Sequence, residues 1–339
     1  MSTPRPFKAA RASPSSSAAN AMTVNPVSLD DIRAARGRIS AHIVRTPLVR
    51  LNVDNTEIFL KLENLQPIGS FKLRGAGNAI AMADPKTLAK GVYTASAGNM
   101  AQGVAWHARR LGIACTVIVP DHAPETKLAA ITRLGGTFIK IPFDEWWQVL
   151  VTRQYPGMEG VFVHPVSDPA VIAGNGTIGL EILEDLPDVA TILVPYGGGG
   201  LSCGIATAVR ALKPDTRIYA SEVETSAAFA AALAEGKPTK IDYKPSFVDG
   251  IGSGSVLAEM WPLAKSLLDG SIVMSLADVA ESVRILAERN RVIAEGAGAT
   301  PVAAAIAGKA GDRVGPVVCV VSGGNIDFEK LARIFRREI

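Results

Sequence analysis

The chain has 339 residues, of which 48% are hydrophobic and 20% charged, and a formal net charge of +3 at pH 7. This length and composition allow a substantial core, in one large domain or in two modest lobes. The 35 basic and 32 acidic residues are spread along the sequence, which excludes the basic stripe of a nucleic-acid-binding protein. The apolar runs are short and end in glycine or proline, so no membrane-embedded segment is expected.

The cysteines and histidines indicate neither a disulfide framework nor a metal site. The three cysteines, Cys115, Cys203 and Cys319, stand in apolar or small-residue contexts without a CxxC spacing. Buried, unreactive thiols in a reducing cytoplasm are therefore expected. The four histidines are scattered without metal-ligand spacing, so no zinc site is predicted.

Residues 1–27 are rich in Ser, Ala and Pro and contain no acidic residue, a composition that does not form a core. The segment loosely resembles an organelle transit peptide. A disordered tail, or a start codon assigned too early, is the preferred interpretation because Met22 opens a stretch typical of a protein beginning. The folded body is expected from Ser28, since Ser28 and Asp31 give a helix N-cap signal before apolar residues at helical spacing.

After this first helix, apolar runs typical of strands alternate with helix-like runs. Such alternation predicts an α/β fold with mostly parallel sheets covered by helices on both faces. Several of the runs end in glycine-rich turns, where open α/β sheets place their ligands. The expected strands are 58–63, 91–96, 114–120, 137–142, 161–164, 191–196, 217–222, 271–276 and 317–324.

The segment GSFKLRGAGNA places Lys72 between Phe71 and an apolar helix-like stretch. Taken alone, a lysine beside an aromatic residue is most simply a surface residue whose stem covers apolar neighbours. A lysine in a partly dry pocket, however, has a lowered amine pKa, which is what a Schiff-base nucleophile requires.

The segment TASAGNMAQG is a predicted strand that ends in small residues and opens a helix. Ser96, Gly98 and Asn99 would direct N–H donors toward the helix N-terminus, a suitable place for a carboxylate or phosphate. The alternative is an ordinary strand-to-helix turn in which Ser and Asn act as caps.

The segments VPYGGGGLSCGIA and VVSGGNID complete the set of candidate ligand sites. Four glycines after a strand allow backbone N–H groups to close on an anion such as a cofactor phosphate; they are Gly197, Gly198, Gly199 and Gly200. A dinucleotide-binding turn is the rival interpretation, weakened because Ser202 replaces the last glycine of that motif, although Glu222 could serve as its ribose-binding acid. Ser322 ends the final strand and could cap a turn or meet a ring nitrogen.

In this order and at these separations, the four segments coincide with one family. The sequence resembles the fold-type II pyridoxal 5'-phosphate (PLP) enzymes, in particular the threonine/serine dehydratase and serine racemase group, from about Ser28 to Phe328. The resemblance implies a fold like that of the tryptophan synthase β chain, with two lobes that each contain a mostly parallel sheet covered by helices. It implies a large PLP-binding domain of residues 28–90 and 167–339 and a small mobile domain of residues 91–166.

The resemblance also implies a role for each motif. Lys72 would bond to the cofactor and act as the catalytic base, with Phe71 beside the pyridine ring, Asn99 at the ring oxygen and Ser322 at the ring nitrogen. Because a neutral serine cannot keep that nitrogen protonated, β-elimination is favoured over transamination. The implied phosphate site is Gly197, Gly198, Gly199, Gly200 and Leu201. The implied substrate site is Ser96, Gly98, Asn99 and Met100.

The implied activity is β-elimination of water from a β-hydroxy amino acid such as L-threonine or L-serine, followed by hydrolysis to a 2-oxo acid and ammonia. Ala97 stands where racemases of this group carry a second serine, so dehydration is preferred over racemisation. Those racemases also bind a divalent cation through a glutamate that Glu222 matches. The second ligand position falls at Ala228, so no required metal is predicted.

Further departures surround the expected substrate pocket. Met100 replaces the common histidine, Asn175 replaces the common glutamine, and HPVSDP lacks the usual aromatic-acid pair. Two adjacent tryptophans on a helix cannot both face the core, so either Trp146 or Trp147 lines the pocket mouth, or the pair packs at a surface or interface. A less common substrate, such as hydroxyaspartate, phenylserine or a hydroxyectoine-derived amino acid, is therefore an alternative, and a racemase-type isomerase or a non-enzymatic binding protein are others.

The sequence closes with a predicted final helix, FEKLARIFRREI, shortly after SGGNID. Biosynthetic threonine dehydratases carry a regulatory domain at this point, so the chain resembles the short catabolic form. Relatives of this kind are commonly dimers, which implies a cytoplasmic homodimer that acts on a small amino acid.

Overall fold

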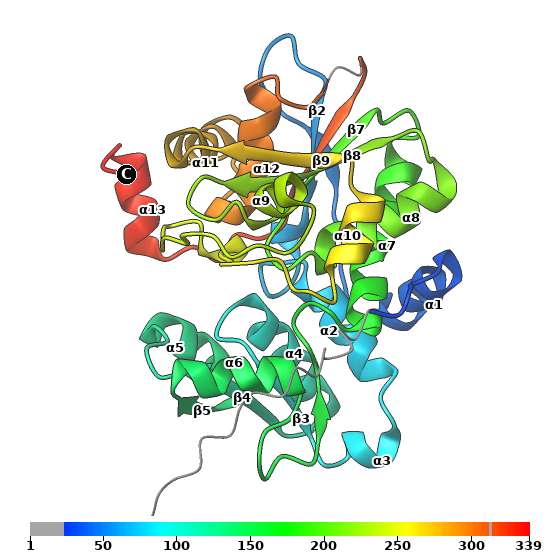
Figure 1. Cartoon of the computed structure of the whole chain (residues 1–339), viewed down its shortest axis with the longest axis vertical. Helices are drawn as coiled ribbons and strands as arrows, with labels where there is room; N and C mark the ends of the chain where they lie inside the picture. Colours follow the sequence, from blue (N-terminus) through cyan, green and yellow to red (C-terminus); the bar gives the residue numbers. More distant parts are fainter. Residues whose placement is uncertain (1–23, 312–313) are drawn as a thin grey trace, which may run out of the picture.

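The computed structural model describes residues 24–311 and 314–339, and its strands form two separate sheets (Figure 1). β1 pairs antiparallel with its neighbour, and the other neighbours of the larger sheet are parallel. The last strand of the chain therefore lies inside this sheet, between two strands that precede it. The six strands are, in spatial order, β1 (Leu48–Arg50), β2 (Ile58–Leu62), β10 (Val317–Val321), β7 (Thr191–Pro195), β8 (Arg217–Val223) and β9 (Gly270–Met274).

The smaller sheet has four strands, and every neighbouring pair in it is parallel. Its strands are, in spatial order, β5 (Thr137–Ile141), β4 (Cys115–Pro120), β3 (Val92–Ala95) and β6 (Val161–Phe162). Every run that the sequence analysis expected to be a strand is confirmed as one. β1, a short edge strand, was not expected.

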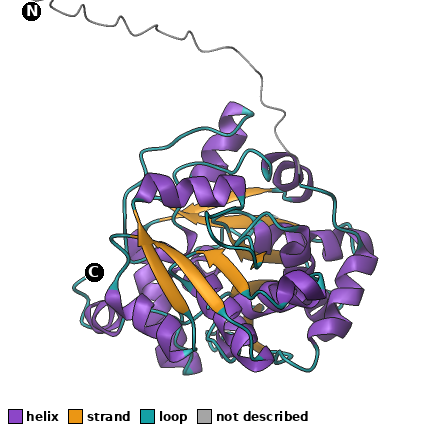
Figure 2. Cartoon of the chain, turned by 90° about the horizontal axis from the view of Figure 1, so that it is seen from below, coloured by secondary structure: helices purple, strands orange, loops and turns teal. Residues whose placement is uncertain are grey.

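Helices lie around both sheets (Figure 2). Two short 3₁₀ helices also occur in the described residues: η1 (Glu63–Leu65) directly follows β2, and η2 (Asp249–Ile251) lies between α9 and α10. The α-helices are α1 (Leu29–Ile39), α2 (Lys72–Ala81), α3 (Pro85–Leu88), α4 (Asn99–Leu111), α5 (Glu125–Arg133), α6 (Phe143–Thr152), α7 (Pro169–Asp185), α8 (Gly200–Leu212), α9 (Ala228–Glu235), α10 (Trp261–Leu267), α11 (Leu276–Asn290), α12 (Gly296–Ile306) and α13 (Phe328–Phe335). In Figure 1, α4, α5 and α6 lie beside the four-stranded sheet, whereas α8 to α13 lie beside the six-stranded sheet.

The folded body begins close to the expected position. Ser28 caps α1 by accepting a hydrogen bond from the Asp31 N–H, and the Asp31 side chain accepts from the Ser28 N–H, so the predicted capping box is confirmed. Val27 is also buried in the core, so packing starts just before the capped helix. The expectation for residues 1–23 lies outside the described residues.

The core lies between the sheets and their helices, and the three cysteines are buried in it, as expected. Helices α7 and α8 pack closely because Gly204 has no side chain: a Cβ there would lie 2.4 Å from the Ile172 carbonyl oxygen. In the two described ranges, no helix has the length and apolar character needed to cross a membrane.

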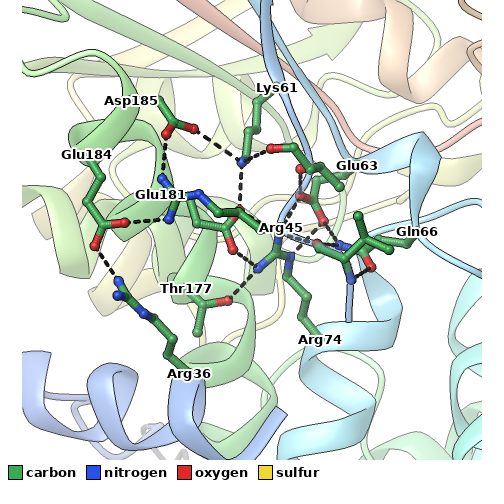
Figure 3. Close-up of polar contacts among 12 residues, drawn as sticks. Arg36, Arg45, Lys61, Glu63, Gln66, Arg74, Thr177, Glu181, Glu184 and Asp185 are labelled. Carbon is green, nitrogen blue, oxygen red and sulfur yellow. Dashed lines mark hydrogen bonds and ion pairs between the residues drawn. The ribbon is translucent and has the colours of Figure 1, made fainter. Parts of the chain in front are cut away.

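A buried network of charged side chains joins α2 to β2 and α7 (Figure 3). Arg74 donates to both carboxylate oxygens of Glu63, each at 2.8 Å, and to both of Glu181, at 2.7 and 2.8 Å. Lys61 Nζ donates to Glu181 at 2.6 Å, and all four side chains are at most 5% exposed. Because α2 begins at Lys72, this network sets the position of the helix that carries the candidate catalytic lysine.

Candidate active site

A cavity of about 480 Å³ lies between the two sheets and collects the residues that the sequence singled out. Such a volume is typical of small-molecule sites. Further wall residues, discussed below, come from segments that the sequence analysis did not single out. The predicted residues that line the cavity are Phe71, Lys72, Ser96, Gly98, Asn99, Met100, Gly197, Gly198, Gly199, Gly200, Leu201 and Ser322.

Lys72 is the first residue of α2, and its amine lies inside this cavity. Nζ donates a hydrogen bond to the Pro165 carbonyl at 2.5 Å. Burial lowers the pKa of Lys72 to about 8, and the nearby Glu295 charge opposes this change. The interpretation of Lys72 as an ordinary surface lysine is therefore wrong. A larger fraction of its amine is neutral near pH 7 than in an exposed lysine.

The glycine turn, Gly197–Gly200, forms another wall of the cavity and leads into α8. A Cβ on Gly198 would lie 2.6 Å from a Val166 methyl carbon, and one on Gly200 would lie 2.6 Å from the Val166 carbonyl oxygen. Gly199 has φ +92°, a conformation that side chains disfavour. Only glycine fits these positions, and the first N–H groups of α8 have no partner within the helix. Together these features make a site for an anion.

Asn175 does not belong to the substrate pocket, contrary to the sequence-based expectation. It lies on α7, almost fully buried, and its side-chain amide donates to the Gly200 carbonyl at 3.2 Å. The close packing of α7 and α8 places it behind the glycine turn. The asparagine at this position therefore supports the glycine turn and does not line the cavity.

Asn99, the first residue of α4, is held in one orientation by two partners. Its Nδ2 donates to the Glu295 carboxylate at 3.0 and 3.2 Å, and its Oδ1 accepts from Asn325 Nδ2 at 2.8 Å. Burial raises the pKa of Glu295 to about 7, and the Asn99 hydrogen bond opposes this change. The sequence analysis missed both partners, although Asn325 belongs to the SGGN motif. Glu295 stands in no motif that could have identified it.

Residues 96–98, the loop before α4, form the wall of the cavity next to the N-terminus of that helix. The Gly98 N–H donates to Ser96 Oγ at 3.2 Å, and Ala97 also lines the cavity. Met100 is almost wholly buried and contributes apolar wall. The arrangement presents helix N–H groups beside a hydroxyl and an amide, which suits a carboxylate.

The two adjacent tryptophans on α6 have different environments. Trp146 lines the cavity, and its indole Nε1 donates to the Ile118 carbonyl at 3.2 Å. Trp147 is 42% exposed. The structure thus places Trp146 at the pocket and Trp147 at the surface.

Glu222 lies on β8, outside the cavity, and its carboxylate has three donors. The backbone N–H groups of Phe229 and Ala230 donate to its two oxygens at 2.7 and 2.8 Å, and Ser271 Oγ donates at 2.5 Å. Both oxygens of this carboxylate therefore already accept hydrogen bonds, two of them from the start of α9. No cluster of three or more metal-ligating side chains occurs within residues 24–311 and 314–339.

Comparison with protein families matches residues 39–323 to the pyridoxal-phosphate dependent enzymes. The chain belongs to this family. It is 39% identical to the L-threonine ammonia-lyase of Thermotoga maritima, over 92% of this chain and 79% of that protein. It is 37% identical to the catabolic L-threonine dehydratase TdcB of Escherichia coli K12, over 91% of this chain and 96% of that protein.

Solved structures of the same fold-type II PLP enzymes match almost the whole chain. The maize serine racemase structure aligns with a TM-score of 0.84 and 31% identity, covering 92% of this chain and 98% of the racemase. The structure of the processed form of threonine deaminase isoform 2 from Solanum lycopersicum aligns with a TM-score of 0.80 and 29% identity, covering 95% of this chain and 98% of the deaminase. The expected α/β fold of this family is confirmed, and PLP is the cofactor.

The residues of the cavity fit PLP. The glycine turn has no room for side chains and offers free N–H groups, as a phosphate requires. Lys72 offers an amine with a lowered pKa, as an aldehyde requires. Asn99 and Ser322 place an amide and a hydroxyl in the same cavity, as a hydroxylated pyridine ring requires.

We expect Glu295→Gln to lower the pKa of Lys72 below its value of about 8, because the variant removes the negative charge that raises it. The measurement is the pH dependence of Lys72 acylation in cofactor-free protein, followed by mass spectrometry. Glu125→Gln, which removes an exposed carboxylate paired with Lys140, is the control and should not move the midpoint. An unchanged midpoint in Glu295→Gln would contradict the coupling.

Proposed function

We propose that this PLP enzyme eliminates water from a β-hydroxy amino acid such as L-threonine or L-serine, and that hydrolysis of the product then gives a 2-oxo acid and ammonia. The observation that carries the proposal is the cavity that holds Lys72 together with Asn99, the glycine turn and Ser322. The names of the curated relatives, L-threonine ammonia-lyase and threonine dehydratase, support the same reaction.

When bound, PLP supplies an aldehyde that condenses with amines and a ring that accepts the electron pair left after loss of the α-proton. Phe71, Asn99 and Ser322 would hold the ring, and the glycine turn with Leu201 would hold the phosphate. Ser322 is neutral, so it does not keep the ring nitrogen protonated, which favours elimination over transamination.

Lys72 would move the proton from the substrate α-carbon to its own Nζ, acting as general base. The lowered pKa of Lys72, about 8, suits this role near neutral pH because the amine must be free of its proton to accept one. The β-hydroxyl would leave as water by taking up one proton, which balances the proton that Lys72 took from the α-carbon. Hydrolysis then gives one 2-oxo acid and one ammonia, so the overall reaction consumes no oxidant or reductant.

Ser96, Gly98 and Asn99 would bind the substrate α-carboxylate at the N-terminus of α4. This end of the cavity combines the helix N–H groups with the Ser96 hydroxyl. Met100 and Trp146 supply apolar wall that excludes water from the reacting bonds. Because Trp146 is fixed by its bond to the Ile118 carbonyl, it bounds the space for the β-substituent.

The test is a panel assay of oxo-acid and ammonia release from serine, threonine, hydroxyaspartate and phenylserine. Release from threonine or serine is the expected outcome. Preferred release from hydroxyaspartate or phenylserine would support the alternative of a dehydratase for a less common substrate. Absence of release from all four would reject the proposal.

A racemase-type isomerase is the second candidate, because serine racemase structures are among those that the chain resembles. Ala97 lines the cavity beside Ser96, and its methyl group cannot donate a proton to the opposite face of the substrate. Dehydration is therefore the preferred function. Chiral analysis of the amino acid left in the panel assay separates the two, since inversion without oxo acid would favour the isomerase.

We further propose a cytoplasmic homodimer that needs no divalent cation at Glu222. The three donors already bound to the Glu222 carboxylate support the last point. The division into a large domain of residues 28–90 and 167–339 and a small mobile domain of residues 91–166 remains part of the proposal. The two separate sheets support it, since β3 to β6 all fall in the small domain.

A further inference from the structure

An ion pair crosses the cavity between the four-stranded side and the six-stranded side of the molecule. Lys127 Nζ, on α5, lies 2.9 Å from Asp249 Oδ2, on η2, and both residues line the cavity. Their side chains are 36% and 37% exposed, so the pair stands where the cavity meets solvent. It therefore joins two parts of the chain that are 122 residues apart in sequence.

The Asp249 end of the pair is packed rigidly against the cofactor site. A Cβ on Gly250 would lie 3.2 Å from Glu295 Oε1, and a Cβ on Gly197 would lie 3.1 Å from the Ile251 Cα. The backbone of η2 thus touches both the first residue of the glycine turn and the carboxylate that orients Asn99. Asp249 has little freedom to move independently of these groups.

The Lys127 end of the pair belongs to the part of the molecule that carries the proposed carboxylate-binding loop. Leu128 and Ile131 of α5 are buried in the same apolar cluster as Met100, on the first turn of α4. Asn99 begins α4, and the loop of Ser96 and Gly98 precedes it. A displacement of α5 away from η2 would therefore carry this loop away from the glycine turn, which η2 contacts.

We propose that Lys127 and Asp249 are positioning residues whose ion pair holds the Ser96–Asn99 loop against the glycine-turn side of the cavity while an amino acid is bound. A pair that is one-third exposed gains little net free energy, so it breaks and forms readily, in contrast to the buried Arg74 network. This property suits a contact that must open to admit substrate and close before reaction. The inference rests on the proposed function only for its kinetic readout.

The test compares Lys127→Gln, Asp249→Asn and the double variant as PLP-loaded enzymes. Lys330→Gln is the matched control because Lys330, on α13, lies 3.8 Å from the same Asp249 oxygen but belongs to the six-stranded side. One readout is hydrogen exchange of the amides in α5 and in residues 96–99, which requires no turnover. The other is kcat and KM for the substrate that the panel assay identifies, at low and high salt.

Each single variant is expected to exchange faster in both segments and to raise KM about two- to five-fold, with a smaller change in kcat. The double variant should match either single variant, because one interaction is lost in all three. At high salt the wild type should approach the variants, since screening weakens an exposed pair.

The proposal would be overturned if both single variants had the same amide exchange rates and the same KM as the control Lys330→Gln. Effects that add in the double variant would also overturn it, because each residue would then act alone. Should the panel assay find no substrate, the exchange readout still decides the inference, so its failure is distinguishable from failure of the proposed function.

Discussion

The Lys72→Ala variant will release oxo acid and ammonia at least about 10⁴-fold more slowly than the wild type. The variant lacks both the amine that bonds to the cofactor aldehyde and the base that takes the α-proton. Its glycine turn, Asn99 and Ser322 are intact, so PLP should still bind without a covalent bond. The measurement is single-turnover release of oxo acid at saturating PLP.

The covalent role has its own readout. Borohydride reduction should add the mass of the cofactor less one oxygen atom to the wild-type chain, at Lys72, because the bond forms with loss of water and reduction adds two hydrogens, and it should add nothing to Lys72→Ala. Lys90→Ala is the control, because Lys90 is 54% exposed and pairs with Glu159 away from the cavity. If Lys72→Ala retained turnover comparable to Lys90→Ala, the assignment of Lys72 would be wrong.

The Arg74→Met variant will lower the free energy of unfolding by about 3–5 kcal/mol, because it leaves the Glu63 and Glu181 carboxylates buried with too few partners. Urea unfolding of the PLP-loaded protein measures this change. Arg45→Met is the matched control. Arg45 pairs with Glu184 and Asp185 but is 48% exposed, so its loss should cost less than about 1 kcal/mol.

The loss of unfolding free energy in Arg74→Met should depend on pH. Burial alone would raise the pKa of Glu63, but the charge and hydrogen bonds of Arg74 hold it below its ordinary value of 4.5. In the wild type this contribution to stability is present above pH 4.5 and is lost as the pH falls through the lower, folded pKa. Arg74→Met should raise the pKa of Glu63, so the difference in free energy of unfolding between the two proteins should narrow as the pH falls from the raised pKa of the variant to the lowered pKa of the wild type. If Arg74→Met and Arg45→Met lowered the free energy of unfolding equally at pH 7, the buried network would not have the proposed stabilising role.

Much of the fold follows from local patterns in the sequence. Runs such as Val317–Val321 and Thr191–Pro195 are apolar over the length of one strand and end at glycine-rich turns, so both their structure and their place at the site were predictable. Ser28 and Asp31 showed the first helix in the same way, since a capping box is a local motif. The short edge strand β1 has no such pattern and was missed.

The cavity residues that sequence analysis missed act through partners distant in the chain. Glu295 receives its hydrogen bond from a residue 196 positions away, and the Pro165 carbonyl accepts from Lys72 across 93 positions. Asn175 does not line the cavity, although its amide supports the glycine turn, because the sequence does not show which side of α7 faces the cavity. Two of the four motif segments, TASAGNMAQG and VPYGGGGLSCGIA, combine a strand end, a turn and a helix start, which is a local pattern.

The position of β10 has a consequence for biosynthesis. Its register places Val317–Val321 between β2 and β7, yet those strands leave the ribosome long before it. Until this last segment emerges, both neighbours present unpaired edges, which are sites for wrong association. Ser322 follows β10 directly, so the nascent chain cannot complete its cofactor cavity before residue 322 has left the ribosome.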